Sequence, residues 1–282
     1  MNFVRSALIS IAMLGAFSTS QAMAGEFTPY LPPPGGGSVE FNFVHQNSQT
    51  GLFAQGSARP WQRFEQNAYQ LSGNYGVSDK LAIDARITYS DTDFVPNGNG
   101  PASGQNGLSD TQIGLRYRLL DELDKAPVTL TLGLSGILRG LYTPTSIDTL
   151  GEGGSGAQFG VSIGKLVTKK LALVAEIGGR ARLNSVPEEF FYSAEAAYAF
   201  HPRFSAWAGV TVSNSVGGVD IGTSGFAARG FPALNEDVKL WQVGGDLALT
   251  KKISLTGSYG RKFAGRNTVE GPFFRTGLRF SF

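Results

Sequence analysis

The stretch FFRTGLRFSF, residues 273–282, ends the chain in a strictly alternating pattern. Successive side chains of a β-strand point to opposite faces, so this stretch has one apolar face and one polar, mostly cationic face. The apolar face holds Phe274, Thr276, Leu278, Phe280 and Phe282. The other face holds Phe273, Arg275, Gly277, Arg279 and Ser281. Such a strand requires surroundings that accept aromatic side chains outside and arginines inside.

The composition narrows the class of protein. Of 282 residues, 16% are charged, 38 are glycine and none is cysteine. The formal net charge of +2 is too small to indicate a nucleic-acid partner or a generally acidic substrate. With only two histidines and no cysteine, the sequence predicts no metal site and no cofactor.

The first 24 residues predict a cleaved secretory signal. Arg5 precedes an apolar run at 7–17, and Ala22-Met23-Ala24 fits the small-x-small cleavage rule, which makes Gly25 the mature N-terminus. The run is shorter than the roughly 20 residues that a membrane-spanning helix needs. A membrane-anchoring helix is the alternative. After export, a chain without cysteine is held by no disulfide.

Alternating segments recur down the rest of the chain. The clearest is VTLTLGLSGIL at 128–138, in which Val and Leu alternate with Thr, Gly and Ser over the length of a tilted transmembrane strand. We predict strands at 38–46, 66–76, 81–90, 110–119, 128–139, 157–167, 171–182, 189–200, 204–213, 238–249, 253–262 and 272–282. The predicted class is all-β.

The connections indicate how these strands are joined. Tight polar turns at 77–80, 168–170, 201–203 and 250–252 alternate with longer, softer segments at 91–107, 141–156 and 214–236. Outer-membrane barrels have short periplasmic turns and long external loops, and an even number of strands. We therefore predict that residues 38–282 form a closed antiparallel up-and-down transmembrane β-barrel of about 12 strands.

Aromatic residues on the apolar faces gather at the strand ends. Those near the short turns are Tyr75, Tyr117, Tyr198, Phe200, Phe204, Phe280 and Phe282, and those near the longer segments are Tyr89, Phe159, Phe190, Tyr192, Trp241, Tyr259 and Phe274. Two belts of amphipathic rings suit the two interfaces of a membrane. A soluble β-sandwich, with a second sheet over the apolar faces, is the alternative.

The C-terminal residues also resemble a known type of signal. Outer-membrane proteins of Gram-negative bacteria commonly end in an alternating strand closed by Phe, which their insertion machinery reads, and GLRFSF resembles such a signal. The resemblance implies a location in the Gram-negative outer membrane, with Phe282 as the insertion signal. The implied partners are outer-membrane lipids and the barrel-insertion machinery.

Motifs that would indicate catalysis lack their structural context. GVSIG at 160–164 matches a G-x-S-x-G nucleophile elbow, but it lies inside an alternating strand with no helix pattern after it. GEGGSG at 151–156 lacks the Lys-Ser/Thr of a phosphate-binding loop. His45 lies near the outer end of the first strand without a matching serine motif. We predict that the chain has no catalytic residues and is not an enzyme.

If the apolar faces meet lipid, the opposite faces line a lumen. The predicted lumen-lining and selectivity residues are Asp84, Arg86, Asp110, Arg116, Arg118, Arg139, Glu176, Arg180, Arg182, Glu195, Arg275 and Arg279. Cross-strand ion pairs satisfy charge in small barrels, and closure would bring Glu40 beside Arg275 and Arg279. One hypothesis is that these pairs brace the lumen. The other is a selective constriction, in which the arginines at 116, 118, 180 and 182 form a cationic patch.

The segment GEFTPYLPPPGGGS, residues 25–38, is too rich in proline and glycine for a long strand or helix. We interpret residues 25–37 as a periplasmic lead-in to the barrel. The alternative is a partial plug that folds into the lumen.

The segment GLSDTQIGLRYRLL, residues 107–120, resembles the outer-membrane transporters named for the meta-pathway of phenol degradation. The matching pattern is a glycine, an aspartate three residues later and a strand that ends in basic-Tyr-basic, here Gly107, Asp110, Arg116, Tyr117 and Arg118. The resemblance implies passage of small, including aromatic, compounds. We expect a channel that passes small aromatic or anionic solutes, and a non-conducting structural or adhesive barrel is the alternative.

Overall fold

The computed structural model describes residues 27–97, 101–144 and 147–282, so the predicted signal peptide at 1–24 lies outside the described residues. The strands are β1 (Gly37–Leu52), β2 (Ala58–Gly76), β3 (Leu81–Val95), β4 (Ser103–Leu108), β5 (Thr111–Leu120), β6 (Thr129–Leu138), β7 (Gly156–Leu166), β8 (Leu171–Arg182), β9 (Glu188–His201), β10 (Phe204–Val216), β11 (Asp237–Ala248), β12 (Ile253–Arg266) and β13 (Thr268–Ser281). The short helices are η1 (Ala54–Gly56), η2 (Glu122–Asp124), α2 (Ser224–Arg229) and η3 (Phe231–Ala233). No helix among these residues is long and apolar enough to cross a membrane.

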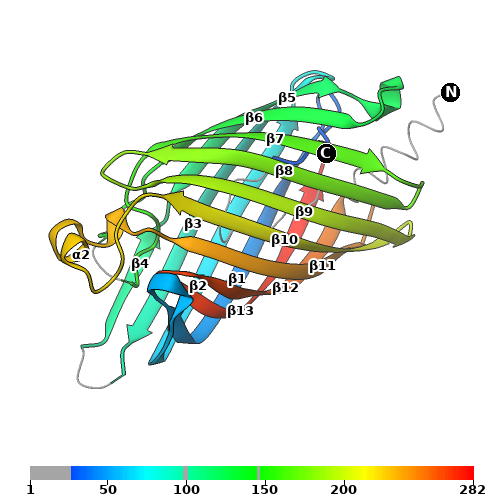
Figure 1. Ribbon diagram of the computed structural model, residues 1–282. Coiled ribbons are helices and arrows are strands. Elements are labelled where there is room, and N and C mark those ends of the chain that lie inside the picture. Colours follow the sequence, from blue (N-terminus) through cyan, green and yellow to red (C-terminus); the bar gives the residue numbers. More distant parts are fainter. Residues whose placement is uncertain (1–26, 98–100, 145–146) are drawn as a thin grey trace.

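The strands form one closed antiparallel barrel (Figure 1). Apart from β4 and β5, each strand pairs with its neighbours in the sequence, and β1 closes the ring by pairing with β13. Both β4 and β5 pair with β3, at its two ends, and only Ser109 and Asp110 separate them. They therefore act as one interrupted strand, and the wall has twelve strand positions, which confirms the predicted class.

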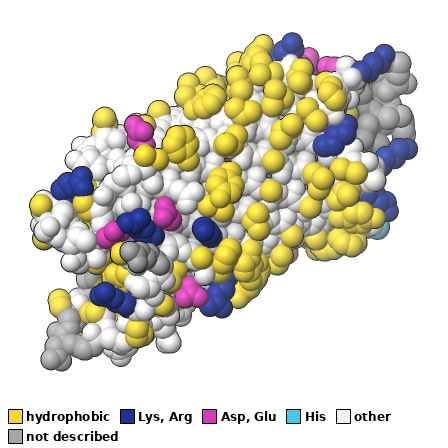
Figure 2. Space-filling model, viewed as in Figure 1, with side chains coloured by type: hydrophobic (Ala, Val, Ile, Leu, Met, Phe, Trp, Pro, Cys, Tyr) yellow, Lys and Arg dark blue, Asp and Glu magenta, His cyan; other side chains and the backbone are white. Residues whose placement is uncertain are grey.

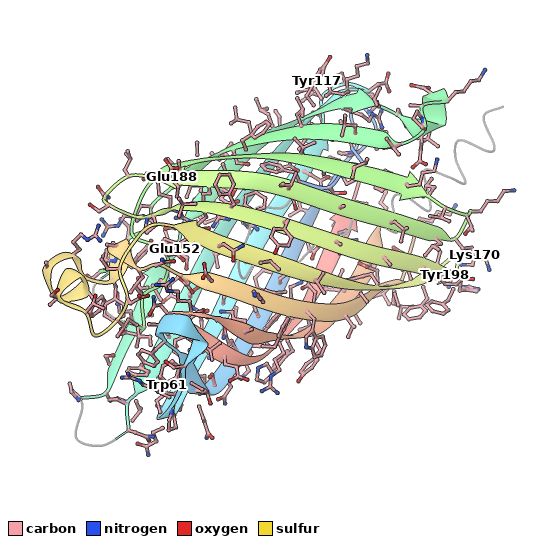
Figure 3. The ribbon with its side chains drawn as sticks, viewed as in Figure 1. Trp61, Tyr117, Glu152, Lys170, Glu188 and Tyr198 are labelled. Atoms are coloured by element: carbon pink, nitrogen blue, oxygen red, sulfur yellow. The ribbon has the colours of Figure 1, made fainter. Side chains whose placement is uncertain are left out.

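The two ends of the barrel differ. The turns at 77–80, 167–170 and 249–252 lie at the end where the chain terminates, called here the turn end. The segments 139–144, 147–155 and 217–236, the last of which carries α2, lie at the opposite or loop end (Figure 1). Figure 3 shows Lys170 at the turn end and Trp61 at the loop end.

Several connections at the loop end are shorter than predicted. Most of the predicted loop 91–107 is strand, because β3 runs to Val95 and β4 starts at Ser103. Likewise β1 and β2 continue to a hairpin at 53–57, five residues join β8 to β9 at 183–187, and Asn267 alone joins β12 to β13. The alternation of apolar and polar side chains stops where lipid would end, but the hydrogen-bonded pairing of the strands continues beyond that point. The predicted strict alternation of short and long connections is therefore wrong.

The outer surface of the wall is an apolar band, with charged side chains mostly towards its ends (Figure 2). Leu115, Leu134 and Phe159 lie directly opposite one another on β5, β6 and β7, and each is about half exposed. At the turn end the ring of Phe200 contacts those of Tyr198 and Phe204, at 4.8 Å and 5.8 Å between centroids. Apolar side chains on the outside confirm the predicted orientation of the faces.

The seam between β1 and β13 carries a buried ionic network. Glu40 lies opposite Arg279 in the register. Its carboxylate accepts from Arg279 Nε at 2.7 Å and pairs with Arg275 at 3.6 Å. Arg279 also pairs with Asp246 of β11 at 3.1 Å, and all four side chains are at most 5% exposed. This confirms that Glu40 meets both arginines when the barrel closes.

Replacing Arg279 by alanine is expected to destabilise the barrel strongly. Removing one partner of a buried ion pair costs on the order of 3–5 kcal/mol, because the other charge stays buried without compensation. Here Glu40 and Asp246 would both lose their shortest contact to a cation. Denaturant unfolding of the protein refolded into lipid vesicles measures the difference.

The matched control is Arg261→Ala on β12. Arg261 forms a 2.9 Å pair with Glu270 on the exposed side of the wall, where its side chain is 48% exposed. Exposed pairs contribute about 0–1 kcal/mol. Equal losses for the two variants would contradict the assignment of the seam as the buried brace of the barrel.

Candidate functional site: the lumen

The inner wall contains a trough made of glycines. Gly133, Gly160 and Gly178 lie directly opposite one another on β6, β7 and β8, and all three are buried on the inner face. A Cβ on Gly133 would lie 2.0 Å from the ring of Phe27, and one on Gly160 would lie 2.5 Å from it. The ring therefore packs against bare backbone, which only glycine allows here.

The residues that lead into the barrel occupy the lumen beside this glycine trough. Phe27 N donates to Glu176 Oε1 at 2.9 Å, and Arg116 Nη1 donates to the carbonyl oxygens of Thr28 and Tyr30 at 3.0 Å each. Thr131 Oγ1 donates to the carbonyl of Pro29 at 2.8 Å. Residues 27–30 thus lie inside the wall, which is the geometry of the plug alternative.

Two cavities lie next to each other in the lumen, and the side chains that line both of them are called here the neck. Gln70, Arg86 and Gln112 line both of them. At this neck Gln70 Nε2 donates to Thr88 Oγ1 at 3.2 Å, and Arg86 donates to Gln112. The turn-end cavity, about 130 Å³, also borders Phe27 and Thr28.

The loop-end cavity, about 280 Å³, is lined by both apolar and charged side chains. Apolar side chains come mostly from β2, β11, β13 and the loops, namely Phe64, Ile147, Phe231, Pro232, Leu234, Val238, Val269 and Phe273. Charged side chains come mostly from β3, β8, β9 and the strand ends, namely Arg86, Asp110, Glu152, Arg180, Arg182, Glu189, Glu236 and Lys262. A pocket with an apolar body and convergent polar groups is the usual form of a small-molecule site.

The described parts of one loop, 139–144 and 147–155, border this cavity and are fastened to the wall. Tyr142 Oη donates to Asp110 Oδ1 at 2.6 Å and accepts from Gly153 N at 2.9 Å. Asp110 also pairs with Arg182 at 2.5 Å. Burial and the Asp110 carboxylate raise the pKa of Tyr142, so its hydroxyl stays a donor. The β4–β5 interruption therefore supplies the anchor of the loop.

The loop 217–236 has its own anchor on the β12–β13 connection. Asp220 accepts from Arg266 Nε at 2.7 Å and from Asn267 Nδ2 at 2.9 Å. Asn267 Nδ2 also donates to the carbonyl of Asn235 at 2.8 Å. The Arg266 hydrogen bonds hold the pKa of Asp220 below its usual value, so the anchor persists well into the acid range.

Most of the predicted lumen residues face inward. Those that point inward from their strands are Asp84, Arg86, Arg116, Arg118, Glu176, Arg180, Arg182, Glu195, Arg275 and Arg279. Asp110 lies at the interruption before β5. Arg139 lies beyond the wall, exposed, and donates to the carbonyl of Tyr142, because β6 ends at Leu138.

The four arginines of the predicted cationic patch all have carboxylate partners. The pairs are Arg116–Asp84 at 2.7 Å, Arg118–Asp121 at 2.9 Å, Arg180–Glu189 at 2.8 Å and Arg182–Asp110 at 2.5 Å. The first borders the turn-end cavity, and the last two border the loop-end cavity. These arginines are therefore spread along the lumen with their charge offset.

Sequence reasoning missed the apolar part of the lumen. Trp61, Phe64 and Val269 form a buried cluster with Phe94 and Ile147 at the loop end. These positions fall in or beside segments that the pattern assigned to loops, so no inward face was assigned to them. In the part of the chain that the structure describes, no group of three His, Cys, Asp or Glu side chains could hold a metal ion.

Two carboxyl groups on the loop side of the cavity have raised pKa values. Burial and the neighbouring Glu189 raise the pKa of Glu152, in spite of Arg182, which lowers it. Burial and Glu152 raise the pKa of Glu236. Both groups therefore bind a proton at a higher pH than an ordinary glutamate, for which the pKa is about 4.3.

We expect the ion preference of the lumen to depend on pH above the range where ordinary carboxylates titrate. Burial and Glu152 raise the pKa of Glu236 to about 8, so acidification from above pH 8 to pH 5 protonates Glu236 and makes the cavity more positive. The pKa of Glu152 is raised as well, so it contributes in the same direction. The preference for anions should rise over this interval. Reversal potentials in a salt gradient across planar bilayers measure it.

The control is the double variant Glu152→Gln, Glu236→Gln, in which anion preference should be high at both pH values. A reversal potential in the unsubstituted protein that does not move with pH would contradict the assignment of these two groups.

Known structures share this fold. The COG4313 outer membrane channel from Pseudomonas putida F1 is 15% identical in sequence, with a TM-score of 0.70, covering 93% of this chain and 99% of that chain. The translocator domain of the autotransporter NalP from Neisseria meningitidis is 13% identical, with a TM-score of 0.55, covering 100% and 98%. The NanC porin is 11% identical, with a TM-score of 0.51, covering 85% and 98%. At these identities the likeness establishes the barrel fold.

No protein-family model and no curated protein sequence matches this chain. The resemblance of residues 107–120 to the phenol meta-pathway transporters is therefore not confirmed.

Proposed function

We propose that this chain is an outer-membrane channel that passes small amphipathic solutes, aromatic and acidic compounds among them, through a narrow charged lumen. The observation that carries the proposal is the loop-end cavity of about 280 Å³, which is lined by apolar and charged side chains together and shares lining residues with a second cavity. Sites for drug-sized ligands measure about 300–1,000 Å³, so this one suits smaller molecules.

The charged side chains of the cavity favour a solute that has both an apolar body and a polar group. Arg86, Arg180, Arg182 and Lys262 share the cavity with four carboxyl groups, and two of these, Glu152 and Glu236, have raised pKa values. A small molecule that lays an apolar face on Phe64 and Phe231 can reach the charged wall with its polar end. The phenolic acids that the resemblance at 107–120 implies belong to this class.

The same proposal includes the route to the membrane. Residues 1–24 direct export and are then removed, and insertion is read from Phe282 by the barrel-insertion machinery. Phe282 is exposed on the outer face, stacks on Phe280 at 6.4 Å between centroids, and donates its N–H to the carbonyl of Gly37 at 3.1 Å. It is thus accessible on the edge of the strand that closes the barrel.

A non-conducting structural or adhesive barrel is the second candidate, and one observation favours it. Residues 27–30 lie inside the wall, and Pro144, Ile147 and Leu150 border the loop-end cavity. A barrel blocked in this way would act through its loop-end surface.

Liposome swelling with a graded solute panel tests the channel proposal. We expect swelling with phenolic acids and amino acids, and little with trisaccharides, because the neck and the cavities are small. The matched variant lacks residues 25–30 and should swell faster with every solute that enters. Absence of swelling and of single-channel current in both proteins would support the non-conducting barrel.

A further inference from the structure

The glycine trough, together with Glu176 and Arg116, has the form of a ligand site that the chain itself fills. We propose that it binds an aromatic dipeptide, with the ring in the seat of Phe27, the ammonium on Glu176 and the carboxylate on Arg116, and that this solute displaces residues 27–30. The inference rests on the proposed channel function and names the solute class of the turn-end half of the lumen.

The first element is the ring seat. Three paired glycines leave bare backbone on the inner wall, Phe27 is only 3% exposed there, and its ring packs with Phe191. The ring of Phe191 in turn lies over Gly178, where a Cβ would come within 2.3 Å of it. The seat is therefore shaped for a flat ring, and it is built from rigid strands, whereas the ring that fills it comes from an irregular segment.

The second element is a pair of polar groups at a fixed spacing from the ring. Glu176 accepts the Phe27 N–H at 2.9 Å, and its other oxygen accepts from Ser193 Oγ at 3.4 Å. Arg116 uses Nε and Nη2 on Asp84 at 2.7 Å each, and Nη1 donates to the Thr28 carbonyl at 3.0 Å. Asp84 thus orients Arg116 and directs one N–H group into the seat.

The spacing defines the ligand. Between the nitrogen on Glu176 and the oxygen on Arg116 lie one aromatic residue and one further residue, Phe27 and Thr28. A free dipeptide with an aromatic first residue would place an ammonium and a carboxylate at the same two positions. The backbone bonds each join one ionised side chain to a neutral group, whereas the free dipeptide would bring a full opposite charge to both Glu176 and Arg116. Pairing two full charges adds Coulomb attraction that the backbone does not supply.

The third element is access. The turn-end cavity of about 130 Å³ borders Phe27, Thr28 and Arg116, and it shares Gln70, Arg86 and Gln112 with the loop-end cavity. A solute that passes the neck therefore meets the seat directly. The tethered segment competes with it, because a tether holds Phe27 at a high local concentration.

The test uses the full mature chain and the variant Phe27→Ala, which vacates the ring seat without touching a strand. The probes are the dipeptides phenylalanyl-alanine and leucyl-alanine. In Phe27→Ala, phenylalanyl-alanine should block the single-channel current at a concentration roughly tenfold lower than leucyl-alanine, a ratio that corresponds to about 1.4 kcal/mol. In the unsubstituted protein the block should need more phenylalanyl-alanine, because Phe27 competes.

A wall variant separates the seat from general effects on the lumen. Gly133→Ala in the Phe27→Ala background places a methyl group where the ring would lie and should abolish the preference for the aromatic dipeptide. Gly136→Ala is the matched control on the same strand, since it is exposed on the outer face and a Cβ there meets nothing closer than 3.9 Å.

Calorimetric titration of the detergent-solubilised variants measures the binding of each dipeptide independently of the single-channel current. Tighter binding of phenylalanyl-alanine to Phe27→Ala, lost with Gly133→Ala and kept with Gly136→Ala, would support the site. Equal affinity for the two dipeptides in Phe27→Ala would overturn it even if the protein conducts. Selective binding in a barrel that never conducts would keep the site and reject the channel function.

Discussion

The structure depends on the requirement that every backbone N–H and C=O within hydrocarbon has a hydrogen-bond partner inside the protein. An open sheet with this apolar outer face would leave two unpaired edges in lipid, and β1 would be one of them. Pairing of β1 with β13 removes both edges. The buried network around Glu40 and Arg279 lies on this junction, so the closing pair of strands is also fixed by charge.

Closure then decides what the inner wall can hold. Twelve strand positions enclose a lumen too narrow for a wide water channel, and its charges are offset within the wall, as in Arg116 with Asp84. Where the wall is bare, at Gly133 and Gly160, the chain fills the space with Phe27. Asp110 lies where β4 and β5 separate, and its carboxylate accepts a hydrogen bond from Tyr142. This bond fastens the loop that contains Tyr142 beside the cavity. Under the proposed function, the side chains that brace the barrel are also those that would meet a solute.

The sequence predicted the parts of this arrangement that depend on period and on neighbouring strands. Alternation at 273–282 assigned Leu278 to lipid and Arg279 to the lumen, and an up-and-down barrel required that Glu40 meet Arg279. Contacts that depend on the exact register or on loop folding could not be predicted. The glycines at 133 and 160 form a trough only because they are paired across β6 and β7. Strand pairing beyond the apolar band, as at Trp61, has no hydrophobic alternation to mark it.

The central claim is that apolar side chains meet lipid and the opposite set encloses the lumen. The chain contains no cysteine, so single cysteines carrying a nitroxide label can be introduced along β6 and β7 at 134, 135, 158 and 159. In lipid vesicles, labels at 134 and 159 should be accessible to dissolved oxygen and protected from a water-soluble nickel chelate. Labels at 135 and 158 should not be more accessible to oxygen than to the chelate. Loss of this period-two alternation, or nickel access at 134 and 159, would contradict the account.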